Sequence, residues 1–151
     1  MALFVKLPAR LCEWFSDMAE FSEFGFCTTF PSAGKITPLT KPVVVLGTKS
    51  VEILDNATDE TGTIITDSRV AVETFSISIH VPREQGGVGC CAILDRLIDL
   101  LLYATPLKIT GICSEDAVYI RNTDSLNLTA TFTLSENITK ESIYPKEFEI
   151  T

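Results

Sequence analysis

Residues 72–82 read VETFSISIHVP, and from residue 74 onward polar and apolar side chains alternate without exception. The even positions carry Thr74, Ser76, Ser78 and His80, and the odd positions carry Phe75, Ile77, Ile79 and Val81. A period of two predicts a β-strand with one buried face and one polar face. A parallel strand covered by helices on both faces would instead read as a continuous apolar run. We therefore expect a mainly antiparallel sheet that is open on one side.

The glycines that follow this strand suggest a nucleotide-binding turn. Gly87, Gly89 and Ala92 match the G-x-G-x-x-G/A spacing of dinucleotide-binding proteins. However, the preceding strand lacks the continuous apolar pattern that this fold needs, and no second βαβ half follows in the chain. We interpret residues 82–89, PREQGGVG, as a Gly-rich loop that turns from a sheet edge into a helix. A small ligand-binding domain that uses the Gly87–Ala92 loop is the alternative.

Two amphipathic helices and a second alternating strand complete the expected fold. Apolar residues recur every three or four positions from Pro8 to Phe24 and again from about Cys90 to Tyr103, which predicts two helices. Residues 126–135, LNLTATFTLS, repeat the alternation of the first strand. The sequence thus predicts a single α+β domain over residues 1–151, in which a mainly antiparallel sheet carries an N-terminal and a central helix on one face.

An acidic stretch separates two further strand-like segments. Residues 55–69, DNATDETGTIITDSR, are rich in Asp, Thr and Asn, which predicts an extended acidic hairpin or loop. Its acids do not have the spacing of an EF-hand, so we expect no metal site there. The runs PVVVLG and KSVEIL in front of it predict strands with a break or bulge at Gly47.

Composition argues against several classes of function. Twelve basic and twenty acidic residues give a net charge of −8, and the basic residues form no run, so we expect no sequence-specific nucleic-acid binding. The five cysteines contain no C-x-x-C pair, which argues against a zinc site. A catalytic dyad of Cys90 with His80, the only histidine, is not expected because His80 falls on the polar side of its strand. We expect no enzymatic activity, no catalytic residue and no cofactor.

The N-terminal sequence and the apolar helix bear on the location of the protein. Lys6, Pro8 and Arg10 interrupt the apolar start MALFVKLPAR, which therefore lacks the pattern of a signal peptide. The apolar segment Ile93–Tyr103 contains charged residues and is too short to cross a bilayer. We expect a protein that stays in the cytoplasm and has no membrane partner.

The order of these segments resembles that of phage tail terminator proteins, especially those of contractile-tailed phages, prophages and phage-tail-like bacteriocins of Gram-positive bacteria. The resemblance covers about Pro42 to Glu136 and lies in the KPVVVLG strand, the acidic hairpin, VETFSISIHVP, the Gly-Cys turn into AILDRLIDLLL, and LNLTATFTL. It implies a virion structural protein that forms a ring, commonly a hexamer, on the last ring of the tail tube. Such a protein is assembled in the host cytoplasm and is located at the head-proximal end of the tail, where it takes part in head–tail joining.

The resemblance also implies partners and contact surfaces. The partners are further copies of the chain, the tail tube protein, the head–tail connector and, in a contractile tail, the sheath protein, while DNA passes through the acidic ring without sticking. Another head–tail connector or a baseplate component is the alternative within the same particle. The residues expected at subunit or tail-tube interfaces lie in the two loops and on the Ser/Thr faces of the strands; they are Asp59, Glu60, Thr63, Arg83, Glu84, Gln85, Ser76, Ser78, Thr129 and Thr131.

Overall fold

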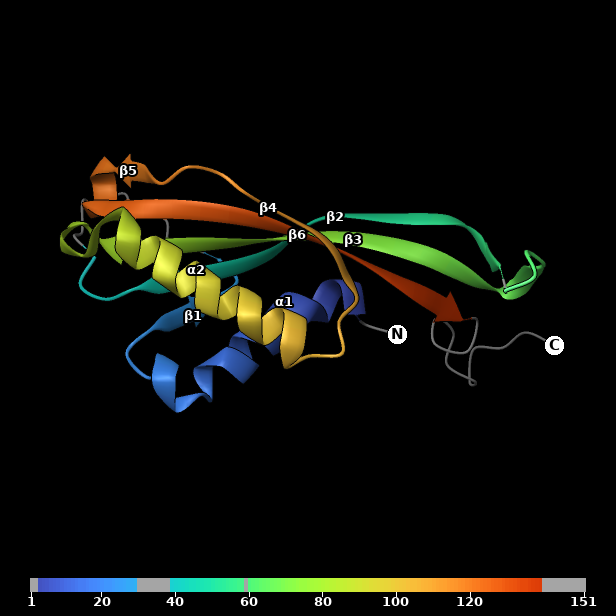
Figure 1. Cartoon of the computed structure of the whole chain (residues 1–151). Coiled ribbons are helices and arrows are strands. Elements are labelled where there is room, and N and C mark those ends of the chain that lie inside the picture. The colour runs from blue at the N-terminus through green and yellow to red at the C-terminus, as the bar shows by residue number, and fades with distance from the viewer. Residues whose placement is uncertain (1–2, 30–38, 59, 140–151) are drawn as a thin grey trace.

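The protein has two layers, a six-stranded sheet and two α-helices that cover one face of it (Figure 1). The computed structural model describes residues 3–29, 39–58 and 60–139. In chain order the elements are α1 (Leu3–Ser16), η1 (Ala19–Phe21), β1 (Gly25–Cys27), β2 (Val43–Thr58), β3 (Ile64–Pro82), η2 (Arg83–Gln85), α2 (Gly86–Tyr103), β4 (Ile109–Ser114), β5 (Val118–Ile120), η3 (Arg121–Thr123) and β6 (Ser125–Thr139).

The sheet is mainly antiparallel, as predicted. Its strands lie in the order β1-β2-β3-β6-β4, and the short β5 pairs with β6 beside this path. Only the pairing of β1 with β2 is parallel. The long central strands β2, β3 and β6 bury one row of side chains each, which places the core between the sheet and the helices.

The core confirms the alternation read from the sequence. The apolar side chains of β3 at Phe75, Ile77, Ile79 and Val81 are fully buried. Phe75 faces Phe132 of β6 in the strand register, and their rings stack with centroids 5.1 Å apart and planes 15° apart. α1 covers β1 and β2, whereas α2 covers β3 and β6. The aromatic stripe of the first helix also lies in the core, since Phe15 is fully buried and contacts Phe21 and Phe26.

The end of the first helix and the position of the bulge in β2 differ from the expected ones. The first helix ends at Ser16 and only a 3-10 turn, η1, follows it, whereas a helix from Pro8 to Phe24 was expected. Pro8 lies inside the helix at the cost of one backbone hydrogen bond, which burial of Leu7 and Leu11 beside it offsets. The irregularity expected at Gly47 lies between Thr48 and Ser50, where a bulge at Lys49 joins the two strand-like runs into one strand.

The expectation of a Gly-rich loop at residues 82–89 is wrong, and this correction has a greater consequence. β3 continues to Pro82, residues 83–85 form η2, and α2 begins at Gly86, so Gly87 and Gly89 lie within the helix. Gly86 has φ +69°, a left-handed conformation that glycine adopts without strain and that turns η2 into α2. Glycine is a poor helix former by about 1 kcal/mol. Burial of Cys90, Ile93 and Leu94 in the first turns of α2 outweighs this local preference.

The hairpin of β2 and β3 extends well past both helices (Figure 1). Pairing of the two strands continues to Thr58↔Ile64, so the acidic stretch 55–69 is a hairpin, as expected. We call residues 51–71 the arm. Neither α1 nor α2 covers the tip of the arm, and the end of β6 runs along the base of the arm on β3.

Candidate functional site

The residues considered for chemistry do not form a reactive group. Cys90 is a buried residue of α2. Its thiol lies 3.7 Å from the Leu126 carbonyl oxygen, and burial raises its pKa. His80 lies on the opposite face of the sheet, and burial lowers its pKa. The sheet therefore separates the thiol from the imidazole. Among the described residues, no cluster of three or more His, Cys, Asp or Glu side chains could hold a metal ion, and none of the helices found there could span a bilayer.

The uncovered face of the sheet carries the predicted row of hydroxyl groups. In the register of β3 and β6, Ser76 faces Thr131 and Ser78 faces Thr129. The Ser78 and Thr129 hydroxyl oxygens are 3.0 Å apart. All four side chains are half-buried and lie outside the apolar core, so their predicted position on one polar surface is confirmed. This surface is uncharged and hydroxyl-rich, which suits a hydrated contact with a neighbouring molecule.

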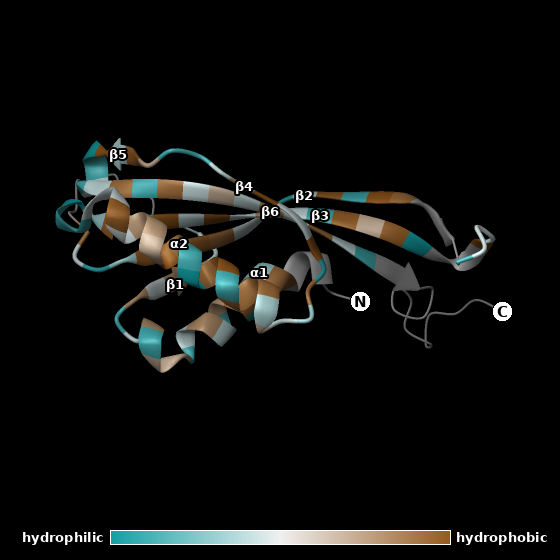
Figure 2. Ribbon diagram, viewed as in Figure 1, coloured by the Kyte–Doolittle hydropathy of each residue, from teal (hydrophilic) through white to brown (hydrophobic). Residues whose placement is uncertain are grey.

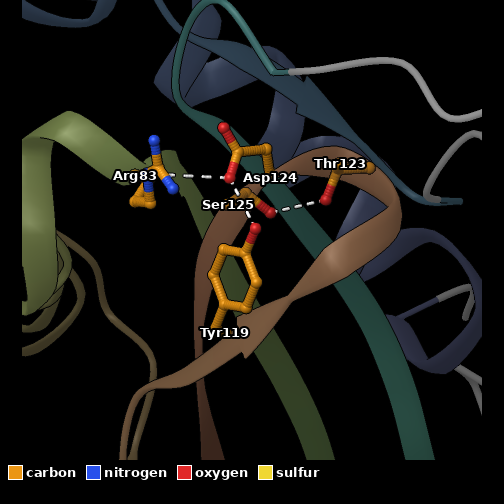
Figure 3. A network of polar contacts seen from close by, with 5 residues as sticks. All are labelled: Arg83, Tyr119, Thr123, Asp124 and Ser125. Carbon is orange, nitrogen blue, oxygen red and sulfur yellow. Dashed lines mark hydrogen bonds and ion pairs between the residues drawn. The ribbon is translucent and has the colours of Figure 1, made fainter.

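A network of polar contacts closes the end of the sheet that lies away from the arm (Figure 3). The Tyr119 hydroxyl donates to Oδ1 of Asp124 at 2.6 Å, and Nε of Arg83 lies 3.7 Å from the same oxygen. The Thr123 and Ser125 hydroxyl oxygens are 2.6 Å apart. The network therefore ties η2 to β5 and to the turn before β6, and it holds the guanidinium of Arg83 close to the body.

The predicted interface residues of the two loops do not come together. Arg83, Glu84 and Gln85 follow the C-terminal end of β3, whereas Glu60 and Thr63 precede its N-terminal end. β3 is 19 residues long. At about 3.3 Å per residue, the two sets are roughly 60 Å apart along the strand. They would have to serve two separate contacts. Glu60, Thr63, Glu84 and Gln85 are all exposed, and Asp59 lies outside the described residues.

The arm exposes apolar side chains that the sequence analysis did not select. Ile64 is 62% exposed and Ile53 is 52% exposed, and Val51 and Leu54 are exposed as well. Apolar colour continues along β2 beyond the helices in Figure 2. The run KSVEIL carries three of these apolar residues and predicts a strand, but the sequence does not show whether a helix reaches far enough to cover it.

Two carboxyl groups with buried oxygens at the base of the arm, the buried Glu73 and the half-buried Glu136, were also missed. Glu73 is fully buried; its Oε1 accepts a hydrogen bond from the Thr48 hydroxyl at 3.1 Å, and its Oε2 has no partner among the residues that the structure describes. Oε2 of Glu136 is likewise buried without a partner. Burial raises the pKa of Glu73, and the nearby Glu136 raises it further; burial also raises the pKa of Glu136. Glu73 occupies an odd position of the alternating strand, where the other odd residues face the core, and this was the signal in the sequence.

Glu136 forms part of the wall of a groove that lies next to the base of the arm. α1, residues 104–108 after α2, and β6 line this groove, which has a volume of about 580 Å³. Its walls are mainly apolar, with Leu11 and Trp14 on one side and Leu107 and Leu134 on the other. The exposed residues Arg10 and Lys108 also belong to its lining. We call it the α1/β6 groove. It lies at the opposite end of α2 from Gly87.

Neither a protein-family model nor a curated protein matches this sequence. Two kinds of surface stand out in the described part of the molecule. One is the uncharged hydroxyl face of the sheet, and the other is the exposed apolar arm with the apolar α1/β6 groove near its base.

Proposed function

We propose that this protein is a structural component of a phage tail, namely a tail terminator that caps the tail tube as a ring and forms the junction with the head connector. The observation that carries the proposal is the arm. An isolated two-stranded hairpin is at best marginally stable in water, and this one also exposes aliphatic side chains. Exposed apolar patches on a soluble protein commonly mark a surface that a partner covers. The arm is therefore a feature expected of a subunit in an assembly.

The edge of the sheet supports the same proposal. Among the described strands β4 pairs only with β6, and Thr110 to Ser114 are exposed along it. An edge strand presents unpaired N–H and C=O groups that can pair with another chain. In a closed ring such an edge faces the neighbouring subunit and is no longer available for uncontrolled growth.

The charge and the open face suit a ring through which DNA passes. The net charge of −8 disfavours adhesion of DNA to the subunit. The hydroxyl row that includes Ser78 and Thr129 carries no cation for a phosphate, and the half-buried Val45 of β2 lies beside Ser78 on this face. A polar face of this kind can line a wet channel or form a hydrated contact.

The test is to measure the mass of the purified chain by light scattering, to image it by negative-stain electron microscopy, and to add it to growing tubes of the tail tube protein from the same genome. We expect an annular particle of about six subunits that arrests tube growth and is seen at one tube end. The control replaces residues 56–68 by Asn-Gly, which shortens the arm but leaves the helix-covered core in place.

Two results would contradict the proposal. One is a chain that stays monomeric at high concentration and does not bind tube ends. The other is a ring that binds the baseplate-proximal end of the tube, which would favour a baseplate component instead.

A further inference from the structure

We propose that the arm of one subunit inserts into the α1/β6 groove of the next subunit, and that this contact builds the ring. The inference rests on the proposed function, because it names the contact by which the ring forms. It commits to a second copy of this chain as the occupant of the groove. Apolar fit, charge and the direction of the arm each support it.

The apolar surfaces of the arm and the groove match in kind. The groove presents Leu11, Trp14 and Leu107 on an open, mostly apolar wall. The arm carries Ile53 and Ile64, both more than half exposed in the single chain. Placing these side chains in the groove removes apolar area from water on both partners, which is the main driving force of association.

The tip of the arm cannot reach the groove of its own subunit. Its strands continue directly from the central strands of the sheet, and their pairing reaches Thr58↔Ile64. The tip therefore points away from α1 and α2 (Figure 1). A contact between Ile64 and the groove thus requires a second chain.

The charges on the two surfaces are complementary. Arg10 and Lys108 at the groove are exposed, and so are Glu52 and Glu60 on the arm. Among the described residues, none of these four takes part in an ion pair within the chain.

A contact between an arm and a groove joins two different patches and is therefore heterologous. Heterologous contacts generate a closed ring when the rotation between subunits closes, and an open filament when it does not. Each subunit then uses its arm on one side and its groove on the other. A variant with a damaged arm can therefore still pair with a variant that has a blocked groove. A two-fold symmetric contact, which uses the same patch on both subunits, would not give this result.

The experiment uses two variants of the full chain. Ile64→Asp places a charge on the arm, and Ala104→Trp fills the groove from an exposed position at the end of α2. The matched controls are Val88→Asp and Ala92→Trp, which make the same types of change at exposed sites near the start of α2. Thermal melts of all four check that the subunit remains folded, and light scattering gives the mass of each protein alone and of the 1:1 mixture of the two variants.

We expect Val88→Asp and Ala92→Trp to form rings like the wild type, and Ile64→Asp and Ala104→Trp to be monomeric alone. Their mixture should give a complex with the mass of two subunits and no larger species, because one intact arm meets one intact groove. The arm does not bind the groove if both variants still form rings. The same holds if both are monomeric and their mixture stays monomeric. In either case the proposed assembly of the wild-type chain into a ring is unaffected. A wild-type chain that does not assemble, alone or on tubes, would overturn the proposed function as well.

Discussion

Replacing Glu73 by Gln should stabilise the folded subunit, and the gain should depend on pH. Oε2 of the fully buried Glu73 has no hydrogen-bond partner within the described part of the chain, and the neighbouring Glu136 adds like charge. Glutamine keeps Oε1 as the acceptor for the Thr48 hydroxyl, which lies 3.1 Å away in the present structure. It replaces the second oxygen by an amide that can donate to the Glu136 carboxylate.

The sign follows from the direction of the pKa shift. The pKa of Glu73 is raised in the folded state, mainly by burial, so the folded chain keeps this proton to a higher pH than the unfolded chain does. The cost of burying the group is absent below its unfolded pKa, grows as the pH rises and is complete above the raised pKa. A buried polar atom without a partner costs about 1–3 kcal/mol. We therefore expect Glu73→Gln to gain about 1–3 kcal/mol at pH 8.5 and progressively less toward pH 5.

The measurement is urea denaturation of the wild type and the variant at several pH values between 5 and 8.5, above the isoelectric point of about 4.6. Repeating it at different protein concentrations separates folding from assembly, because the stability of an oligomer depends on concentration. Glu52→Gln is the matched control, since Glu52 lies on the neighbouring strand and is exposed. It should change the free energy of unfolding by no more than about 0.5 kcal/mol at any pH.

Two outcomes would refute this reasoning about Glu73. A loss of stability at pH 8.5 would mean that the carboxylate has a favourable partner in solution. A gain that is the same at all pH values would mean that the charge of the group is irrelevant. The double variant with Glu136→Gln adds a check, because its gain should be smaller than the sum of the single gains if the two carboxylates repel each other.

Two further pairs of substitutions test the core and the start of α2. Phe132→Ala removes a fully buried ring that stacks on Phe75 and should lower the free energy of unfolding, measured by urea denaturation, by about 3–5 kcal/mol. Ile112→Ala on the edge strand beside it should cost less than about 1 kcal/mol. Equal losses would contradict the position of the core. Gly87→Ala should stabilise the helix by about 0.5–1 kcal/mol, because Gly87 is helical and a Cβ there would lie 4.0 Å from its nearest neighbour. Gly86→Ala should instead lower stability by about 1 kcal/mol, because of its positive φ, so shifts of the melting temperature in the same direction would show that α2 begins elsewhere.

Much of the fold was predictable because its strongest signals are local. Alternation in residues 74–81 and 126–134 fixed which face of β3 and β6 is buried, and the same pattern placed Ser78 and Thr129 on the polar face. The start of α2 was not predictable in this way, because helix preferences disfavour Gly87 and Gly89 and only burial of the residues after them compensates. The bulge at Lys49 depends on how β2 pairs with β3, which local sequence does not specify.

The candidate surfaces were less predictable than the fold. The α1/β6 groove joins Leu11, Leu107 and Leu134, which are far apart in the sequence, so no pattern within a short window could reveal it. The apolar residues of the arm look like core residues in the sequence. Their exposure follows only from the lengths of α1 and α2, which end before they could cover the arm.

The bulge at Lys49 has a consequence for how such a subunit can vary. It lies between the helix-covered body and the arm, so the arm can lengthen or shorten without any change in the packing beneath α1 and α2. Adding two residues to each strand would extend the arm by about 7 Å and keep every side chain on its original face. Adding one residue to one strand would turn that strand over. The reach of the arm is thus adjustable in discrete steps while the core of the molecule stays constant.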